Sequence, residues 1–451
     1  MSNKNFNEKS FTFFTINYIV GFGFLTTIIS LVKLNIFGII VLLTTGFITF
    51  AVSLVYSRLT NSFKEDYGGT YSYSKKLNNK LFSFFLGWNQ YMQGPILAST
   101  APLFLADAAS FLTTDEKIIW IIRLVSILFF IVLVLISTLG LKLNKKIILI
   151  SAIVKWVILA LGMGISLYLS IIQNNFVSNI TTNNQITTYT IFSTILAFMY
   201  AFGGFEDVSS MAKDVKFNNF RKILMISFAF IISFYFIFYI IMLGINNSNI
   251  SNFSQIFSLV FMNTGIIIFV IGLIFNGVSS KISINISTAR KIVALSDDGY
   301  IFGWLSKKNK NNEYKNAIWF NSIITIISLI LFWVIPTFLN LNNFFESVIS
   351  IGSIAFLLQY IFTFIIALIL HFKKKIDKIP LWEIIVYILG SLFIFATLLF
   401  YIFPFILNEK WTINNTIVIT SYFGFLSIGF IIYLIVFMNN KKKLNKNKID
   451  K

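Results

Sequence analysis

The sequence predicts an all-α polytopic membrane protein with about twelve transmembrane helices. Its composition is 57% hydrophobic and only 12% charged, and a soluble protein with that much apolar surface would aggregate, so the apolar excess must face lipid. The apolar residues fall in runs of about twenty, which is the length that crosses a bilayer as a helix. The connections between these runs are too short to bury a core, so we expect one membrane domain and no soluble domain.

Polar or basic breaks separate the apolar runs, and each run is expected to form one helix. The expected helices cover residues 12–32, 36–56, 81–106, 118–140, 147–172, 188–210, 223–245, 259–285, 316–338, 345–371, 382–406 and 413–438. Further apolar runs soon follow the first one, so the N-terminus does not resemble a cleaved signal.

Lysine and arginine residues set the expected orientation, because the cytoplasmic connections of membrane proteins carry an excess of them. Every second connection is basic, as in residues 213–222 and 373–378, whereas the alternate loops 173–189 and 246–256 contain no basic residue. We therefore expect a multi-pass protein of the cell membrane with both its N- and C-termini in the cytoplasm. The basic tail, residues 439–451, is expected to be solvated and to help fix this topology; the alternative is that it binds membrane lipid with anionic headgroups.

Composition and motifs disfavour several functional classes. The formal charge of +19 lies between apolar runs and not on one stripe, so no nucleic-acid partner is expected. The chain has no Cys, few acids and a single histidine, His371, which is interpreted as an ordinary interfacial residue; we therefore expect no metal site, no cofactor and no catalytic residue, and hence not an enzyme. No GxxxxGK[ST] motif is present, so ATP is not expected to drive the protein directly.

Glycines weaken two of the expected helices near the middle of the membrane. The first helix contains IVGFGFLTTI, residues 19–28, and the sixth contains YAFGGFEDVSSMAKDVK, residues 200–216. Every backbone N–H and C=O in a bilayer must be satisfied, so a helix is interrupted only where protein, substrate or water takes over those groups. The offset of five helices is what an inverted repeat of five plus five helices produces, with both breaks at one midplane site. The alternative is that these glycines serve only close helix packing.

The ends of an interrupted helix predict the kind of ligand. Free N–H groups at a positive dipole end suit a carboxylate, and free carbonyls at a negative end suit an ammonium. An α-amino acid carries both groups, and glycine lets such a ligand approach the backbone closely. We therefore expect a small zwitterion as the substrate.

Short motifs along the chain resemble those of a known family. Gly21-Phe22-Gly23-Phe24 is similar to a Gly-Ser-Gly-Ile-Phe pattern, and Tyr200–Glu206 resembles an aromatic-x-Phe-x-Gly-Phe-Glu signature that Ala212–Lys216 continues as Ala-x-Glu-x-Lys. Gly68–Tyr71 matches a Gly-Gly-x-Tyr loop, and Ala289–Gly299 resembles Ser-Arg-x-x-x-Ala-x-x-x-Asp-Gly. In this order the motifs resemble those of the amino acid permeases of the amino acid-polyamine-organocation (APC) superfamily, and the likeness ends near residue 309.

Some residues depart from the family pattern. Phe22 stands where a small residue is usual, and would either narrow the pocket or point away from it. Glu65 stands where a proline precedes the glycine pair, Gly203 is an additional glycine, and Asp297 replaces a common basic residue.

The resemblance implies a LeuT-like fold, in which two inverted repeats of five helices are followed by two accessory helices. The first repeat would cover residues 12–172, the second 188–371 and the accessory helices 382–438. It also implies a substrate site at the two breaks. In the first helix, the backbone of Gly21, Phe22, Gly23 and Phe24 would hold the substrate carboxylate. In the sixth, carbonyls in the segment from Ala201 through Phe202 and Gly203 to Gly204 would hold its amine, Phe205 would complete the site, and Tyr200 would act as a gate.

Two lysines lie within the expected helices, where an ammonium is costly and needs an interior partner. In similar permeases a lysine on helix five occupies the place where sodium-coupled relatives bind a cation, and the resemblance assigns this coupling role to Lys155 as a fixed or titrating charge. The alternative is that Lys155 only ties helix five to carbonyls of helix one.

Lys281 on helix eight is expected to reach the cytoplasmic interface. If it faced the pocket instead, the site would favour substrates with an acidic side chain. Glu206 is expected to cap neighbouring backbone, the alternative being that it neutralises a cationic substrate or Lys281.

These features favour a secondary active amino acid transporter that works by alternating access. Proton coupling as a symporter, or exchange as an antiporter, is favoured over sodium coupling. The alternatives are a sensor that binds an amino acid without moving it and an intramembrane enzyme. The sequence carries no readable signal for which amino acid is carried, for the direction of flux or for the oligomeric state.

Overall fold

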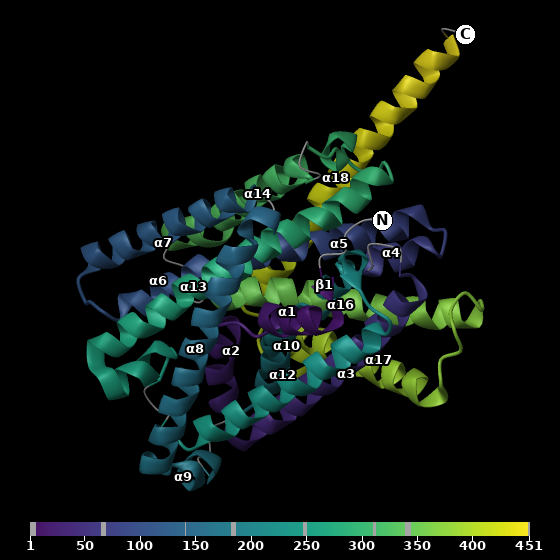
Figure 1. Ribbon diagram of the computed structural model, residues 1–451. Coiled ribbons are helices and arrows are strands. Elements are labelled where there is room, and N and C mark those ends of the chain that lie inside the picture. Colours follow the sequence, from purple (N-terminus) through teal and green to yellow (C-terminus); the bar gives the residue numbers. More distant parts are fainter. Residues whose placement is uncertain are drawn as a thin grey trace.

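The computed structural model describes residues 6–64, 69–139, 141–181, 186–246, 250–309, 313–338 and 344–449, and these residues are almost entirely helical (Figure 1). Their only strands are β1 (Phe6–Asn7) and β2 (Val215–Lys216), which pair in parallel. Glu65 and Gly68 of the expected loop motif lie outside the described residues, and so does the end of the basic tail.

The helices follow one another closely along the chain. The first half contains α1 (Glu8–Ile19), α2 (Gly23–Val32), η1 (Asn35–Phe37), α3 (Gly38–Ser62), α4 (Gly69–Lys75), α5 (Lys80–Ala98), α6 (Thr100–Ser110), α7 (Glu116–Ser137), α8 (Leu141–Gln173) and α9 (Phe176–Thr181). The second half contains α10 (Thr188–Phe202), α11 (Phe205–Ser210), η2 (Ala212–Asp214), α12 (Phe220–Leu243), α13 (Ser254–Asp297), η3 (Gly303–Ser306), α14 (Lys315–Leu329), η4 (Ile330–Val334), α15 (Ile335–Phe338), α16 (Phe344–Phe372), α17 (Leu381–Ile402), η5 (Pro404–Leu407) and α18 (Ile413–Ile449).

Within the described ranges, ten helices are long and apolar enough to cross a membrane, or up to eleven if the bent pair α1 and α2 counts as one span. The protein is therefore a polytopic helical membrane protein, although this count is below the twelve spans expected. The third expected helix, residues 81–106, explains part of the difference between the two counts. This segment forms the two helices α5 and α6, and neither is among the helices long and apolar enough to cross a membrane. Its hydropathy is lowered by buried amides that include Asn89, Gln90 and Gln93.

The eighth expected helix is longer than predicted. α13 covers 44 residues and consists of two helices that meet at a kink at Met262 (φ 49°, ψ −136°). It therefore continues past residue 285 through the connection that was expected to follow it.

The outer helices expose apolar side chains, as expected for a surface that faces lipid. In α7 only 22% of the most apolar stretch is buried inside the protein. Its exposed side chains include Trp120, Ile121, Leu124, Val125 and Leu128.

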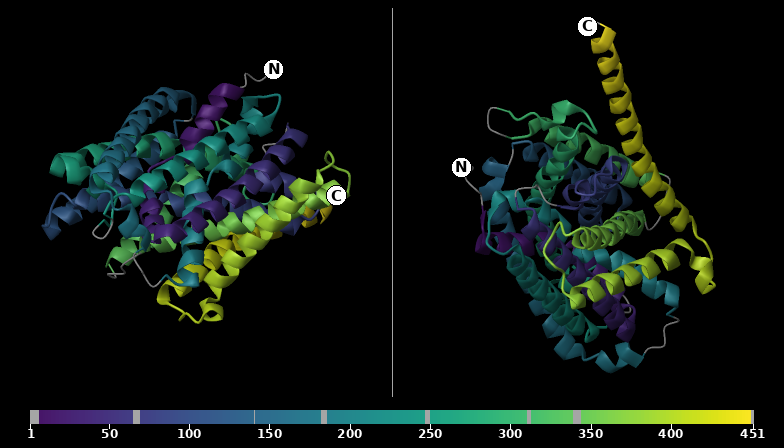
Figure 2. Two further views of the ribbon diagram at one scale, coloured as in Figure 1. Left: turned by 90° about the horizontal axis from the view of Figure 1, so that it is seen from below. Right: turned by 90° about the vertical axis from the view of Figure 1, so that its right-hand side faces the viewer.

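The interrupted helices lie inside the bundle. α10, the first part of the second interrupted helix, packs against α2 and α3. The neighbouring helix α13 packs against α8 and α5 (Figure 1). Helices α16, α17 and α18 pack together, and the C-terminal part of α18 extends beyond the other helices (Figure 2).

A charged cluster joins three helices away from these breaks. Arg58 of α3 donates two hydrogen bonds of 2.8 Å to the Glu383 carboxylate of α17, and Arg221 of α12 donates a third at 2.9 Å. The Glu383 side chain is only 1% exposed, and Tyr387 donates a further hydrogen bond to it at 3.1 Å. A planar guanidinium matches both oxygens of a carboxylate, so Arg58 holds Glu383 in one orientation.

Candidate functional site

The first helix is interrupted where the glycines predict it. α1 ends at Ile19, α2 begins at Gly23, and the two helices are bent by 56°. Val20 N–H still bonds to the Ile16 carbonyl, and Phe24 N–H bonds to that of Gly21. Among the described residues, nothing accepts a hydrogen bond from the N–H groups of Gly21, Phe22 and Gly23. The start of α2 therefore presents free donors at the positive end of its dipole.

The second interruption separates α10 from α11. Gly203 has an extended ψ of 138°, and Gly204 has φ 128°, a backbone conformation that glycine adopts and residues with a Cβ disfavour. Gly204 N–H donates to the Glu206 carboxylate at 2.9 Å, and Tyr360 donates to the same carboxylate at 2.7 Å. Glu206 is fully buried and caps the break, which is the role expected for it. Within the described part of the chain, no donor reaches the carbonyls of Phe202 and Gly203.

Glycine also brings the two breaks into contact. A Cβ added at Gly23 would lie 2.7 Å from Tyr200 Cε1, and one added at Gly204 would lie 2.9 Å from Ile19 Cγ1. Both distances are shorter than carbon atoms tolerate. The close packing weighed as an alternative reading of these glycines is therefore present at both positions, together with the interruption of both helices.

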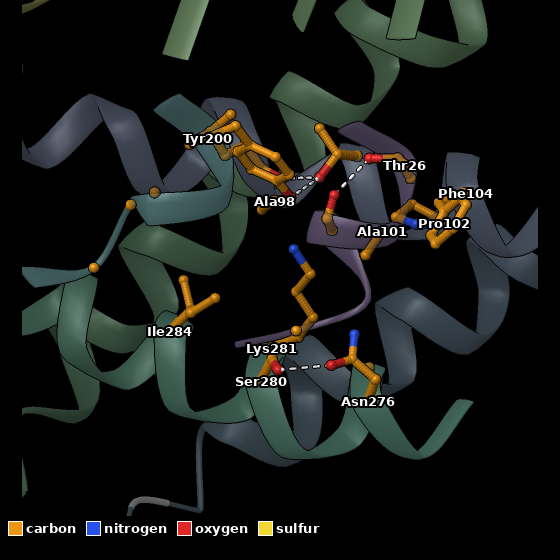
Figure 3. Close-up of a pocket in the computed structure, with 18 of the residues that line it drawn as sticks. Thr26, Ala98, Ala101, Pro102, Phe104, Tyr200, Asn276, Ser280, Lys281 and Ile284 are labelled. Carbon is orange, nitrogen blue, oxygen red and sulfur yellow. Dashed lines mark hydrogen bonds between the residues drawn. The ribbon is translucent and has the colours of Figure 1, made fainter. Parts of the chain in front are cut away.

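A cavity opens beside the two breaks (Figure 3). Its wall is formed by both interrupted helices and by α5, α6, α7, α13 and α16. The space open to water molecules is about 140 Å³, roughly ten times what a single buried water needs. Tyr200 lies on this wall, and its hydroxyl is 3.0 Å from Thr100 Oγ1.

Most of the predicted site residues border this cavity. They are Gly21, Gly23, Phe24, Tyr200, Ala201, Gly203 and Gly204. Phe22 is not on the wall: its ring packs 5.3 Å from the ring of Phe269 and against Gly272 of α13, with 1% of the residue exposed. Phe202 and Phe205 are also buried away from the cavity, with the Phe202 ring 5.1 Å from that of Tyr235. The Phe22 ring thus points away from the cavity, which is one of the two possibilities stated for it, and the predicted roles of the backbone at Phe22, Phe202 and Phe205 remain predictions.

Lys155 of α8 is fully buried at the end of α1. Its ammonium donates to the carbonyls of Asn17 at 2.7 Å and Val20 at 2.8 Å. These carbonyls belong to the last turn before the break, which leaves them without helical partners. Asn17 also donates to Ser279 of α13 at 3.3 Å, which connects the end of α1 to α13. Lys155 does not border the cavity.

Lys281 differs from the expectation. It borders the cavity together with its α13 neighbours Asn276, Gly277, Ser280 and Ile284, and Figure 3 shows its side chain extending into the cavity. The interfacial position expected for Lys281 is therefore wrong. The rotation of α13 that brings this face inward is set by its packing on α8 and α5, which no local pattern reports.

Sequence reasoning missed a polar network beside the breaks. Tyr18 donates to Asp207 at 2.7 Å, and Asp207 also forms an ion pair with Lys291 of α13. Lys291 donates in addition to the Gln90 carbonyl of α5 at 3.3 Å. Asp207 follows Glu206 directly in the sequence, but its partners Tyr18 and Lys291 are distant along the chain, so the sequence alone does not indicate the network.

A polytopic helical membrane protein with two helices interrupted beside one internal cavity has the architecture of a membrane transporter. The chain belongs to the amino acid permease family, since the family model described as "Amino acid permease" matches residues 6–449. It is 35% identical to "Uncharacterized protein MG225" of Mycoplasma genitalium, over 99% of this chain and 98% of that protein. It is also 33% identical to "Uncharacterized protein MG226" of the same organism (72% of this chain, 71% of that protein), and 31% identical to "Uncharacterized protein MG226 homolog" of Mycoplasma pneumoniae (74% and 73%).

Proposed function

We propose that the protein is a secondary active amino acid transporter that works by alternating access. The observation that carries this proposal is the meeting of two interrupted helices at one cavity. The free N–H groups at Gly21, Phe22 and Gly23 supply donors for the α-carboxylate of an amino acid. The unpartnered carbonyls of Phe202 and Gly203 supply acceptors for its ammonium.

The LeuT-like repeat belongs to the same proposal. α1 to α8 would form the first repeat, with α5 and α6 together as its third crossing, and α10 to α16 would form the second. This arrangement places the two breaks in corresponding helices. It also makes α17 and α18 the accessory helices and gives twelve crossings in all.

Coupling is proposed to involve a proton or a second amino acid rather than sodium. Lys155 holds the carbonyls of Asn17 and Val20 with its ammonium, so a fixed cation already occupies the end of α1. Gain or loss of the proton on Lys155 would change how firmly α1 is held beside the break. The protein would then be a proton symporter or an exchanger.

Flux in proteoliposomes tests the proposed function. The purified protein is reconstituted and exposed to each labelled amino acid at two pH values, with and without sodium. Retention of unmodified label inside the vesicles is expected, and it should not require sodium. Binding without retention would indicate a sensor, and chemical conversion of the label would indicate an enzyme.

We further propose that the protein is in the cell membrane with both termini cytoplasmic. Since the chain has no Cys, a single introduced thiol reports on one loop. Lys373 follows α16 and Lys410 precedes α18, and both residues are exposed. The two variants to compare are Lys373→Cys and Lys410→Cys. In intact cells, a membrane-impermeant thiol reagent should label Lys410→Cys and spare Lys373→Cys. The reverse pattern would contradict this orientation.

A further inference from the structure

One charged group on the cavity wall has no partner. Lys281 extends from α13 into the cavity, and among the described residues no hydrogen bond or ion pair reaches its ammonium (Figure 3). The wall from α7 consists mainly of apolar side chains, including Phe129, Phe130 and Leu133, so it supplies no anion. An isolated ammonium inside a membrane protein is costly and calls for a counter-charge.

The other charged groups near the cavity are already satisfied. Asp207 borders the cavity but is paired with Lys291 and accepts a hydrogen bond from Tyr18. Glu206 accepts hydrogen bonds from Gly204 N–H and Tyr360. Lys155 donates to two carbonyls at the end of α1. Of these charged groups around the cavity, Lys281 is the one whose ammonium has neither a hydrogen-bond acceptor nor a counter-charge among the described residues.

The neighbours of Lys281 can also bind an anion. Ser280 donates to Asn276 Oδ1 at 3.3 Å, which leaves the amide N–H groups of Asn276 available as donors. A Cβ added at Gly21 would lie 3.4 Å from the same Asn276 oxygen, so this amide lies next to the break in the first helix. Lys281 and Asn276 therefore provide a cationic donor set close to the free N–H groups of that break.

We propose that the substrate is an acidic amino acid, whose side-chain carboxylate pairs with Lys281. This inference rests on the proposed transport function and adds the substrate class. The free N–H groups of the first break take the α-carboxylate, the carbonyls of the second take the ammonium, and Lys281 takes the second carboxylate. A cationic side chain would be repelled by Lys281, and a neutral one would leave its ammonium buried without a counter-charge.

A competition experiment in proteoliposomes tests this inference. Uptake of labelled L-glutamate and L-aspartate by the unaltered protein is compared with uptake of glutamine, leucine and lysine. Acidic amino acids should be transported and should compete with one another, while glutamine, which differs from glutamate only in charge and donor pattern, should compete weakly. Transport of neutral or cationic amino acids without acidic ones would overturn the inference and leave the proposed function standing. Absence of flux for every amino acid would overturn both.

Variants then assign the effect to Lys281. Lys281→Met should reduce the apparent affinity for glutamate by roughly tenfold or more, because one partner of a buried charge pair is lost. The ratio of glutamate uptake to glutamine uptake should fall as well. Lys281→Arg keeps the charge and should retain part of the glutamate uptake. Lys117→Met, at an exposed position in the first turn of α7, is the matched control and should transport like the unaltered protein. Unchanged glutamate selectivity in Lys281→Met would reject the proposed pairing.

Binding provides a readout that does not depend on flux. A ligand that binds the folded protein raises its unfolding temperature. Glutamate should raise the unfolding temperature of the detergent-purified protein and of Lys117→Met, and the same glutamate concentration should raise that of Lys281→Met clearly less. An equal rise with glutamine would overturn the inference. Replacing chloride by gluconate should leave the glutamate effect unchanged, and dependence of that effect on chloride would assign Lys281 to an inorganic anion instead.

Discussion

Tyr18 and Asp207 join the two interrupted helices directly, because the phenol near the end of α1 donates a 2.7 Å hydrogen bond to the carboxylate in the first turn of α11. Asp207 is also paired with Lys291 of α13, so three elements of the site meet at one carboxylate. An alternating-access cycle has to separate and rejoin such contacts. The first prediction therefore concerns Tyr18.

Tyr18→Phe should weaken closure between α1 and α11. Loss of one hydrogen bond to a charged acceptor is worth about 1.5 to 3 kcal/mol, enough to shift a two-state equilibrium by tenfold or more. Ala294 borders a smaller cavity with Tyr71, Gly87 and Lys291, and Ala294→Cys can report on access there. Thiol labelling of Ala294→Cys should be faster when Tyr18→Phe is present. Equal labelling rates would show that this contact does not control access.

Lys155→Ala should impair coupling. The change removes two hydrogen bonds and leaves the carbonyls of Asn17 and Val20 without their donor. Net uptake should fall and its dependence on pH should flatten, because the group that carries the charge is gone. Uptake with unchanged rate and unchanged pH profile would reject Lys155 as the coupling residue. A loss of uptake that keeps the original pH profile would point to the purely structural tie between α8 and α1.

Some parts of this architecture could be predicted from the sequence, because they depend on residues that are close together along the chain. Gly21 and Gly23 in one apolar run, and Gly203 and Gly204 in another, mark positions where a membrane helix is weak, and both helices are interrupted there. Capping by Glu206 was likewise predictable, since an acid that closely follows a helix break can reach its free N–H groups.

Other features depend on packing that a single sequence does not report. Lys281 faces the cavity because of how α13 is rotated against α8 and α5, and Phe22 points away because Gly272 leaves room for its ring. Asp207 is recognisable as part of a network only when Tyr18 and Lys291 are seen beside it. The third expected span, residues 81–106, is divided between α5 and α6, and its buried amides reduce the hydropathy on which that prediction depended.

Glu383→Gln should lower stability without changing substrate selectivity. It leaves Arg58 and Arg221 near one another without their shared counter-charge. The expected loss is about 2 to 3 kcal/mol, below that of a fully buried pair because the Arg221 side chain is 37% exposed. Thermal unfolding in detergent measures it, with Glu116→Gln at an exposed position of α7 as the control. An unfolding temperature equal to that of the control would show that the cluster does not stabilise the bundle.

Gly23→Ala tests whether the contact between the two breaks matters for transport. The added methyl would lie 2.7 Å from Tyr200 Cε1, so either the Tyr200 ring or the start of α2 must move. Overpacking of this kind costs roughly 1 to 3 kcal/mol, and the displaced ring would also enter the cavity that Tyr200 borders. Uptake should therefore fall while the protein remains folded. Gly164→Ala in α8 is the matched control, because a Cβ there meets nothing within 4 Å and alanine favours a helix. If both variants transport equally well, the space at Gly23 is not needed and the proposed position of the substrate carboxylate at the start of α2 loses its support.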